Sequence, residues 1–336
     1  MLKKIQDYIE AHEQEMLQDA MELIAINSER MEAKPGMPFG EGNAAVLAKA
    51  VEILNRRGFA AKNYDNYVVT ADLNDQPSCL DILAHLDVVP AGEGFTVTQP
   101  FCPVVKDGML YGRGAADDKG PAVAALYALM AVRSLGVDLT GNCRLILGAD
   151  EECGSADIRY YYEREKYAPM TFSPDADFPL INIEKGGLGM RFAASAVCAD
   201  EGVRLIEARV GTKTNVVPGE AKAVIAGLDK KELEELAQMT AQKTGTAAEV
   251  TQEADFVSVL FKGAFCHAAS PENGNNALTA LLAFLAELPF TDTRISSLLK
   301  NLSVLFPHGD WNGKALGVNH EDEVSGKLTL SLNMFV

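Results

Sequence analysis

The sequence is poor in the features that mark several large protein classes. Cysteine is sparse and scattered, at positions 79, 102, 143, 153, 198 and 266, with no CxxC pair. We therefore expect reduced thiols in a cytoplasmic protein, not a disulfide framework or a cysteine-ligated zinc site. No apolar run approaches the roughly 20 residues that cross a membrane, and the first 26 residues lack the unbroken apolar stretch of a secretion signal.

Basic residues are also few. The chain has 30 Lys and Arg against 47 Asp and Glu, which gives a formal net charge of −17. A nucleic-acid partner needs a basic face, so we expect none, and we expect no membrane association either. The glycine-rich stretch "YGRGAADDKG" (111–120) matches neither GxGxxG nor GxxxxGK[ST], and its paired aspartates would repel phosphates. GxSxG and HExxH are both missing.

The order of the predicted elements indicates two domains, as the length of 336 residues also favours. Up to residue 183, predicted helices at 1–26, 40–58, 120–136 and 155–167 alternate with strands at 67–73, 79–87, 143–152 and 170–177 and a hairpin at 101–114. Such alternation is typical of an α/β domain with a largely parallel sheet. From residue 184 the pattern changes to an α+β domain, with strands at 187–199, 221–228, 256–267 and 327–336 and helices at 229–245 and 273–288.

Pairs of polar residues stand where ligand sites gather in α/β sheets, beyond the carboxyl ends of the strands. The pairs are His85 with Asp87, Asp117 with Asp118, Glu151 with Glu152, and Asp175 with Asp177. Each pair alone has an ordinary structural explanation: a histidine with satisfied hydrogen bonds, a helix cap, or solvated loop charge. Together, carboxylates on one rim repel one another unless cations neutralise them.

One imidazole with several carboxylates and no cysteine suits a divalent ion such as zinc, manganese or cobalt. Residues two apart on a strand face the same side, so Asp87 can reach the imidazole of His85 and orient it as a ligand. Adjacent residues face opposite ways, so Glu151 and Glu152 should differ in role. One of them can hold metal while the other acts as general base.

Several separate motifs resemble those of one enzyme family. "HLDVVPAGEGF", "YGRGAADDKGP", "ADEECGS" and "FSPDADFP" are similar to motifs of the di-zinc peptidases that include carnosinases, aminoacylase and carboxypeptidase G. In the second half, "TNVVPGEA" and "FKGAFCHAASPENGNNA" resemble the lid motifs of bacterial dipeptidases of the peptidase V type. The resemblance covers nearly the whole chain, and the motifs follow the family's order.

The resemblance implies a site with two divalent metal ions. Zinc is the expected metal, and manganese and cobalt are the alternatives. It assigns His85 and Asp175 to one metal, Asp117 to both, and Glu152 to the second. It also implies a cis peptide bond between Asp117 and Asp118.

The resemblance assigns the catalytic roles as well. Glu151 is the general base for a metal-activated water, and Asp87 holds the metal-binding histidine. In the lid, His267 meets the carbonyl oxyanion of the substrate and Asn215 helps to bind the substrate's C-terminal carboxylate.

The implied architecture is a zinc-exopeptidase-like catalytic domain at 1–183 and an α+β lid at 184–336, acting as a monomer. The family's return to the catalytic domain, which supplies a last ligand histidine, has no counterpart here. We therefore expect an incomplete second metal position and weak or no activity. The expected function is a metallo-dipeptidase acting on small dipeptides; the alternatives are an N-acyl amino-acid deacylase with the same metal core, or a truncated, non-catalytic remnant that binds metal or peptide.

Overall fold

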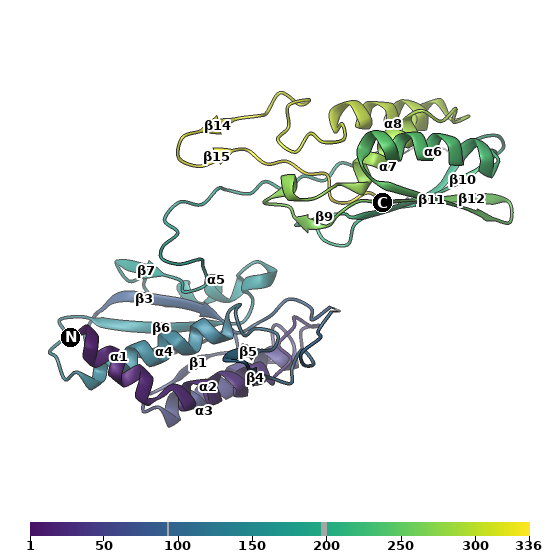
Figure 1. The fold of residues 1–336 in the computed structure, drawn as a ribbon. Helices are drawn as coiled ribbons and strands as arrows, with labels where there is room; N and C mark the ends of the chain where they lie inside the picture. The colour runs from purple at the N-terminus through teal and green to yellow at the C-terminus, as the bar shows by residue number, and fades with distance from the viewer. Residues whose placement is uncertain (93, 196–199) are drawn as a thin grey trace. The chain divides into compact units, whose positions relative to one another are not determined.

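The computed structural model describes residues 1–92, 94–195 and 200–336, and it divides into two compact units, Met1–Ile181 and Asn182–Val336 (Figure 1). Among the described residues, no helix is both long enough and apolar enough to span a membrane. Unit 1 contains helices α1 (Leu2–Ala11), α2 (Glu13–Ile24), α3 (Glu41–Arg56), α4 (Lys119–Ser134) and α5 (Ala156–Tyr162), the 3-10 helix η1 (Glu151–Cys153), and strands β1 (Lys62–Tyr64), β2 (Val68–Asp72), β3 (Ser78–His85), β4 (Val104–Lys106), β5 (Met109–Tyr111), β6 (Asn142–Gly148) and β7 (Met170–Phe172).

The main sheet of unit 1 has the strand order β1-β2-β6-β3-β7. Strands β6, β3 and β7 are parallel, whereas β1 and β2 add an antiparallel edge. The predicted α/β class with a parallel core is therefore confirmed. Because parallel strands end at the same edge of a sheet, His85 at the end of β3 lies opposite Gly148 at the end of β6.

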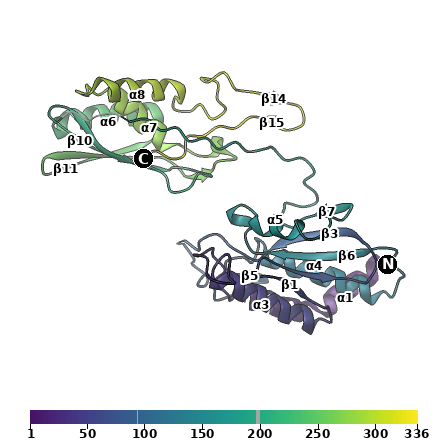
Figure 2. The same cartoon turned by 180° about the vertical axis from the view of Figure 1, so that it is seen from behind.

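Helices cover both faces of this sheet. Figures 1 and 2 show α1–α4 on one face and α5 on the other. Alternation along β6 matches these two layers: Leu145 and Leu147 belong to the larger core against α1–α4, and Ile146 packs with Val68 and Tyr161 on the α5 face. The sheet is thus buried on both faces, which explains why β3 and β6 read as nearly continuous apolar runs.

The hairpin and the N-terminal helices of unit 1 follow from residues in their turns. The predicted hairpin forms from β4 and β5, and Asp107 and Gly108 at its turn both have positive φ, 52° and 76°. Such a turn favours Asp-Gly because both central residues adopt left-handed conformations. The N-terminal helical pattern forms two helices, because the chain breaks at His12, whose ring stacks on Tyr8 at 4.0 Å.

Unit 2 contains a four-stranded antiparallel sheet in the order β11-β12-β10-β8 with helices packed on one face. Its elements are strands β8 (Arg204–Arg209), β9 (Val216–Val217), β10 (Glu220–Ala226), β11 (Ala247–Glu253), β12 (Phe256–Lys262), β13 (Cys266–His267), β14 (Glu321–Asp322) and β15 (Gly326–Lys327), helices α6 (Lys230–Thr244), α7 (Ala277–Ala286) and α8 (Thr293–Leu305), and the 3-10 helix η2 (Pro271–Asn273). Helices α6 and α7 contact the sheet, and α8 packs on α7. The predicted helices at 229–245 and 273–288 correspond to α6 and α7.

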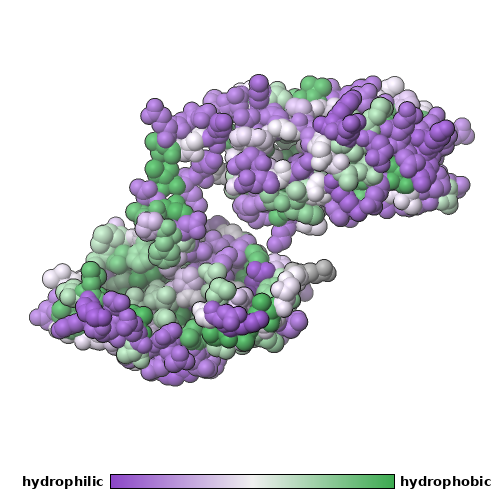
Figure 3. All heavy atoms as spheres, in the orientation of Figure 1, coloured by the Kyte–Doolittle hydropathy of each residue, from purple (hydrophilic) through white to green (hydrophobic). Residues whose placement is uncertain are grey.

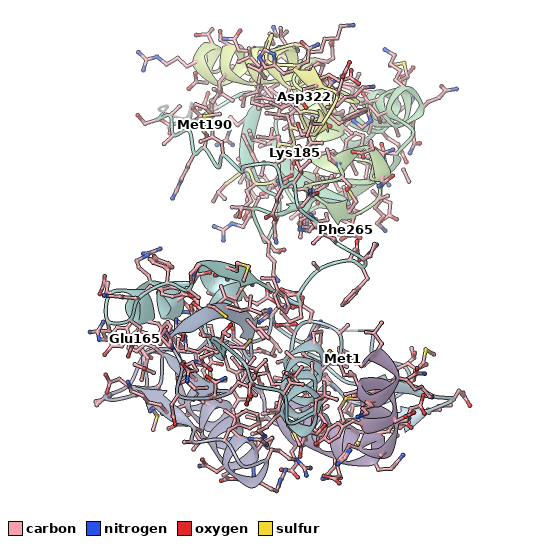
Figure 4. All side chains as sticks on the ribbon, turned by 90° about the vertical axis from the view of Figure 1, so that its left-hand side faces the viewer. Met1, Glu165, Lys185, Met190, Phe265 and Asp322 are labelled. Atoms are coloured by element: carbon pink, nitrogen blue, oxygen red, sulfur yellow. The ribbon has the colours of Figure 1, made fainter. Side chains whose placement is uncertain are left out.

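Two predicted strands of this unit were wrong. The first, 187–199, has no regular structure over residues 187–195, and residues 196–199 lie outside the described residues. Its alternating side chains Leu188, Met190 and Phe192 are 82%, 63% and 77% exposed. On the face drawn in Figure 3, hydrophilic residues cover much of unit 2. Figure 4 labels Met190 within residues 187–195. Alternation alone does not form a strand; a partner strand must complete the hydrogen bonds.

The second wrong prediction is the strand at 327–336. This segment makes backbone hydrogen bonds to several places: Leu328 to His320, Leu330 to Trp311, and Phe335 to Val210. Because these partners lie on different segments, no continuous ladder forms.

Candidate metal centre

The strand order brings the predicted ligand residues to one edge of the unit 1 sheet. His85 ends β3, and its side chain is only 4% exposed. Asp117 precedes α4, and Asp175 follows β7, which pairs in parallel with β3. These two carboxylates are more accessible, with side chains 60% and 33% exposed. A buried imidazole therefore meets two partly solvated carboxylates.

The three side chains form a compact cluster. His85 Nε2 lies 3.0 Å from Asp117 Oδ1 and 3.3 Å from Asp175 Oδ2. One ligand atom from each residue lies within 4.8 Å of the other two. The peptide bond between Asp117 and Asp118 is cis, as the family resemblance implied.

The donor set fits a divalent metal ion. His85 Nε2 is buried and has no hydrogen-bond partner among the described residues, although it faces both carboxylates. Donor atoms about 2.0–2.2 Å from one tetrahedral zinc ion lie roughly 3.3 Å from one another, which matches the observed separations. Burial lowers the pKa of His85, but Asp117 and Asp87 outweigh it and raise that pKa to about 12. The surroundings thus favour a positive charge at this position, as a cation would supply.

Asp87 contacts His85 mainly through its main chain. His85 Nδ1 lies 3.1 Å from the Asp87 carbonyl oxygen and 3.4 Å from its carboxylate. A proton on Nδ1 that is donated to this carbonyl leaves Nε2 free as a metal donor. The buried carboxylate accepts two other hydrogen bonds, from the backbone N–H groups of Glu151 and Glu152, both at 3.1 Å.

Glu151 and Glu152 lie on η1, immediately beyond β6. Glu151 Oε2 is 3.9 Å from His85 Nε2, and its side chain is 53% exposed. Burial, followed by the charges of nearby carboxylates, raises the pKa of Glu151. Glu152 is not part of the three-residue cluster, but burial and then the charge of Asp117 raise its pKa. It therefore lies within electrostatic reach of Asp117.

Two neighbouring polar contacts were missed by sequence reasoning. Asp118 does not cap α4 with its side chain; its Oδ2 accepts the backbone N–H of His85 at 3.0 Å. Lys119 is fully buried, and its Nζ donates to the Leu23 and Ile26 carbonyls at 3.0 and 2.8 Å. A lysine in the first turn of a helix is unfavourable for the helix dipole, which is the signal that could have pointed to such a role.

A third contact supports the Glu151–Glu152 loop. The buried carboxylate of Asp150 pairs with Arg30 and accepts the Ala156 N–H at 3.1 Å. Arg30 also lies over the Phe39 ring at 5.0 Å. No short sequence motif signals a contact between residues 30 and 150.

The two predicted lid residues lie side by side in unit 2. Strand β13 pairs with β9 so that His267 is opposite Val216, and the Ala268 N–H donates to the Asn215 carbonyl at 2.8 Å. His267 and Asn215 are both exposed. The Ala269 N–H donates to His267 Nδ1 at 3.1 Å, so the neutral ring carries its proton on Nε2. The imidazole therefore presents a hydrogen-bond donor at the surface of unit 2.

Comparison with known proteins identifies the family. The family model described as "Peptidase family M20/M25/M40" matches residues 82–288, more than half of the chain. The chain is 35% identical to "Putative dipeptidase YtjP" of Bacillus subtilis over 95% of its own length, and 34% identical to "Beta-Ala-Xaa dipeptidase" of Lactobacillus delbrueckii subsp. lactis over 97%. It covers 69% of each of these two relatives.

A solved structure with similarity is that of human carnosine dipeptidase 1. The match has 31% identity and a TM-score of 0.42, and it covers 49% of this chain and 38% of the human chain. The family match and the two bacterial relatives carry the assignment: the chain belongs to peptidase family M20/M25/M40.

Proposed function

We propose that this chain is a metal-dependent hydrolase of small dipeptides, with its metal at the cluster of His85, Asp117 and Asp175. The observation that carries the proposal is the buried Nε2 of His85, which faces two carboxylate oxygens at 3.0 and 3.3 Å. Membership of a peptidase family and the dipeptidase names of two relatives support the reaction class. The β-alanyl dipeptides in one relative's name suggest the first substrates to test.

The ion at the cluster is proposed to be zinc, with manganese and cobalt as competitors, because the donors are one imidazole and carboxylates. A divalent ion held there supplies Lewis acidity for the scissile carbonyl and lowers the pKa of a water toward about 7. We propose a second ion between Asp117 and Glu152. Asp117 and Glu152 are the two carboxylates that the family resemblance assigns to it.

Glu151 is the proposed proton acceptor. Its carboxylate is half-exposed, it lies next to the cluster, and burial raises its pKa. An acceptor with a raised pKa is better matched to proton transfer near neutral pH than an ordinary glutamate. After accepting the proton of the attacking water, Glu151 can donate it to the leaving amine.

Unit 2 is proposed to bind the substrate as a lid. Nδ1 of His267 accepts the Ala269 N–H, so the ring proton lies on Nε2, which suits donation to a carbonyl oxygen that gains negative charge. Asn215, its neighbour, is proposed to bind the C-terminal carboxylate of the dipeptide. A cytoplasmic location and a monomeric state are part of the same proposal; the cysteine spacing supports the first and the family resemblance the second.

Turnover with defined metals tests this function. The purified chain, freed of metal and resupplied with zinc, manganese or cobalt, should hydrolyse a β-alanyl dipeptide faster than an N-acetyl amino acid. His85→Ala should lose both metal binding and turnover, whereas His320→Ala, a change of an exposed histidine in unit 2, should keep both. Preference for the N-acetyl amino acid would favour the deacylase alternative. Metal-independent turnover, or no turnover with any of the three metals, would contradict the proposal.

A further inference from the structure

Four consecutive backbone N–H groups after β6 donate to two buried aspartates. Ala149 and Asp150 donate to Oδ2 of Asp157, at 2.6 and 2.9 Å. The next two N–H groups, of Glu151 and Glu152, donate to the two oxygens of Asp87 at 3.1 Å. The whole backbone from the end of the strand to the two glutamates is therefore held by carboxylates.

Asp157 is well suited to this task. It lies in the first turn of α5 and is completely buried. Its other oxygen, Oδ1, accepts the Ile158 N–H at 2.7 Å, so both oxygens are used. The strand end is shaped around it: a Cβ at Gly148 would lie 2.2 Å from Asp157 Oδ2. The carboxylate and the absence of a side chain at position 148 thus form one fitted contact.

The helical bonds of η1 alone would hold this loop weakly. The turn contains three residues, and its helical bonds, Cys153 N–H to Asp150 and Gly154 N–H to Glu151, are 3.3 and 3.2 Å long; one further backbone bond, from the Ser155 N–H to the Asp150 carbonyl at 2.8 Å, closes the loop. Hydrogen bonds to a buried charged acceptor are roughly twice as strong as neutral ones. The position of the two glutamates consequently depends more on the aspartates than on η1.

We infer that Asp157 is a positioning residue for the active site: by binding the N–H groups of Ala149 and Asp150, it fixes the backbone that carries Glu151 and Glu152. The inference rests on the proposed function. Asp157 touches neither the substrate nor the three-residue cluster, and it acts through the main chain. Its loss should therefore impair proton transfer, where a shift of 1 Å can cost about 100-fold in rate. The ion at His85, Asp117 and Asp175 should be little affected, because none of those ligands comes from this loop.

The first test uses the unaltered chain. Amide hydrogen exchange followed by NMR should show protection at residues 149–152 comparable to that of β6. Exchange at the rate of an exposed loop would overturn the inference, whatever any variant does.

The second test is Asp157→Asn, which keeps the shape but places an N–H₂ group against a backbone donor. We expect kcat to fall about 10- to 100-fold, KM to change less than about twofold, and cobalt affinity at the His85 position, followed by absorption titration, to stay within about threefold. Gly148→Ala, which disturbs the same contact from the strand side, should reproduce this pattern.

Ile53→Ala is the matched control, because it destabilises unit 1 by removing buried side-chain atoms of α3. It should lower thermal stability while leaving kcat per folded molecule unchanged. Folded Asp157→Asn with normal kcat, or a parallel loss of cobalt affinity and kcat, would show that Asp157 is merely structural. A parent chain without turnover would instead contradict the proposed function, and that result does not involve Asp157.

Discussion

Replacing Asp87 with alanine should separate its two contacts. The variant loses the carboxylate that accepts the Glu151 and Glu152 N–H groups, but it keeps the main-chain carbonyl 3.1 Å from His85 Nδ1. The imidazole should therefore largely keep its orientation. The loop that carries the two glutamates should lose two of the hydrogen bonds that hold its position.

The magnitudes follow from these bonds. Water can reach these part-buried N–H groups once the carboxylate is gone, so each lost bond should cost about 0.5–1.5 kcal/mol, and the metal-free variant should be about 1–3 kcal/mol less stable. Loss of a group that orients a metal ligand typically costs 10- to 100-fold in affinity. Because the carbonyl of Asp87 remains, we expect about tenfold for the ion at His85, which is about 1.4 kcal/mol.

Urea unfolding of the metal-free chain and a cobalt titration at a temperature where the variant is folded measure the two effects separately. A 100-fold loss of affinity with unchanged stability would show that the Asp87 carboxylate serves the imidazole and not the loop. Unchanged stability together with unchanged affinity would remove Asp87 from the account altogether.

Three further changes test other parts of the molecule. Glu151→Gln should abolish turnover and leave metal binding nearly intact, because an amide cannot accept the proton; comparable activity would exclude Glu151 as the base. His267→Ala should lower turnover without altering cobalt binding, and a loss of cobalt would contradict its assignment to the substrate. Burial raises the pKa of Asp19, but hydrogen bonds from Arg57, Tyr127 and Arg56 outweigh it and lower that pKa, so the stability from Asp19 is present above about pH 4 and is lost as pH falls through the lowered pKa. Asp19→Asn should thus cost about 3 kcal/mol at pH 7 and progressively less as the pH falls below about 4, measured by urea unfolding; a cost that does not change with pH would refute this.

The sequence predicted the three metal-ligand candidates because the order and direction of the strands determine where those residues lie. His85 ends strand β3, Asp175 follows β7, and Asp117 precedes a helix that begins at the same edge. Parallel strands end together, so polar residues after them must meet. Strong apolar periodicity likewise made α3, α4 and β6 predictable from the sequence.

The supporting contacts could not be predicted in the same way. Asp157 reads as an ordinary acidic residue in the first turn of a helix, where it complements the dipole. Its bonds to the backbone seven and eight residues earlier depend on how α5 packs against the end of β6. The role of Asp87 was only partly predicted: strand geometry placed it near His85, but not its contact with the loop of Glu151.

The failed strands show a different limit. Residues 187–195 and 328–336 alternate apolar and polar side chains as clearly as some real strands do. What they lack is a continuous partner among the described residues, and a single sequence does not reveal which strand pairs with which. Local pattern thus predicted the sheet of unit 1 better than the extended segments of unit 2.

Crystals of the chain soaked with zinc, and measured at the zinc absorption edge, test the central claim most directly. The account predicts an anomalous peak within about 2.2 Å of His85 Nε2 and of one oxygen each of Asp117 and Asp175. His85→Ala crystals should lose that peak. A zinc ion bound elsewhere in unit 1 with the cluster empty, or a peak that persists without the imidazole, would contradict the account.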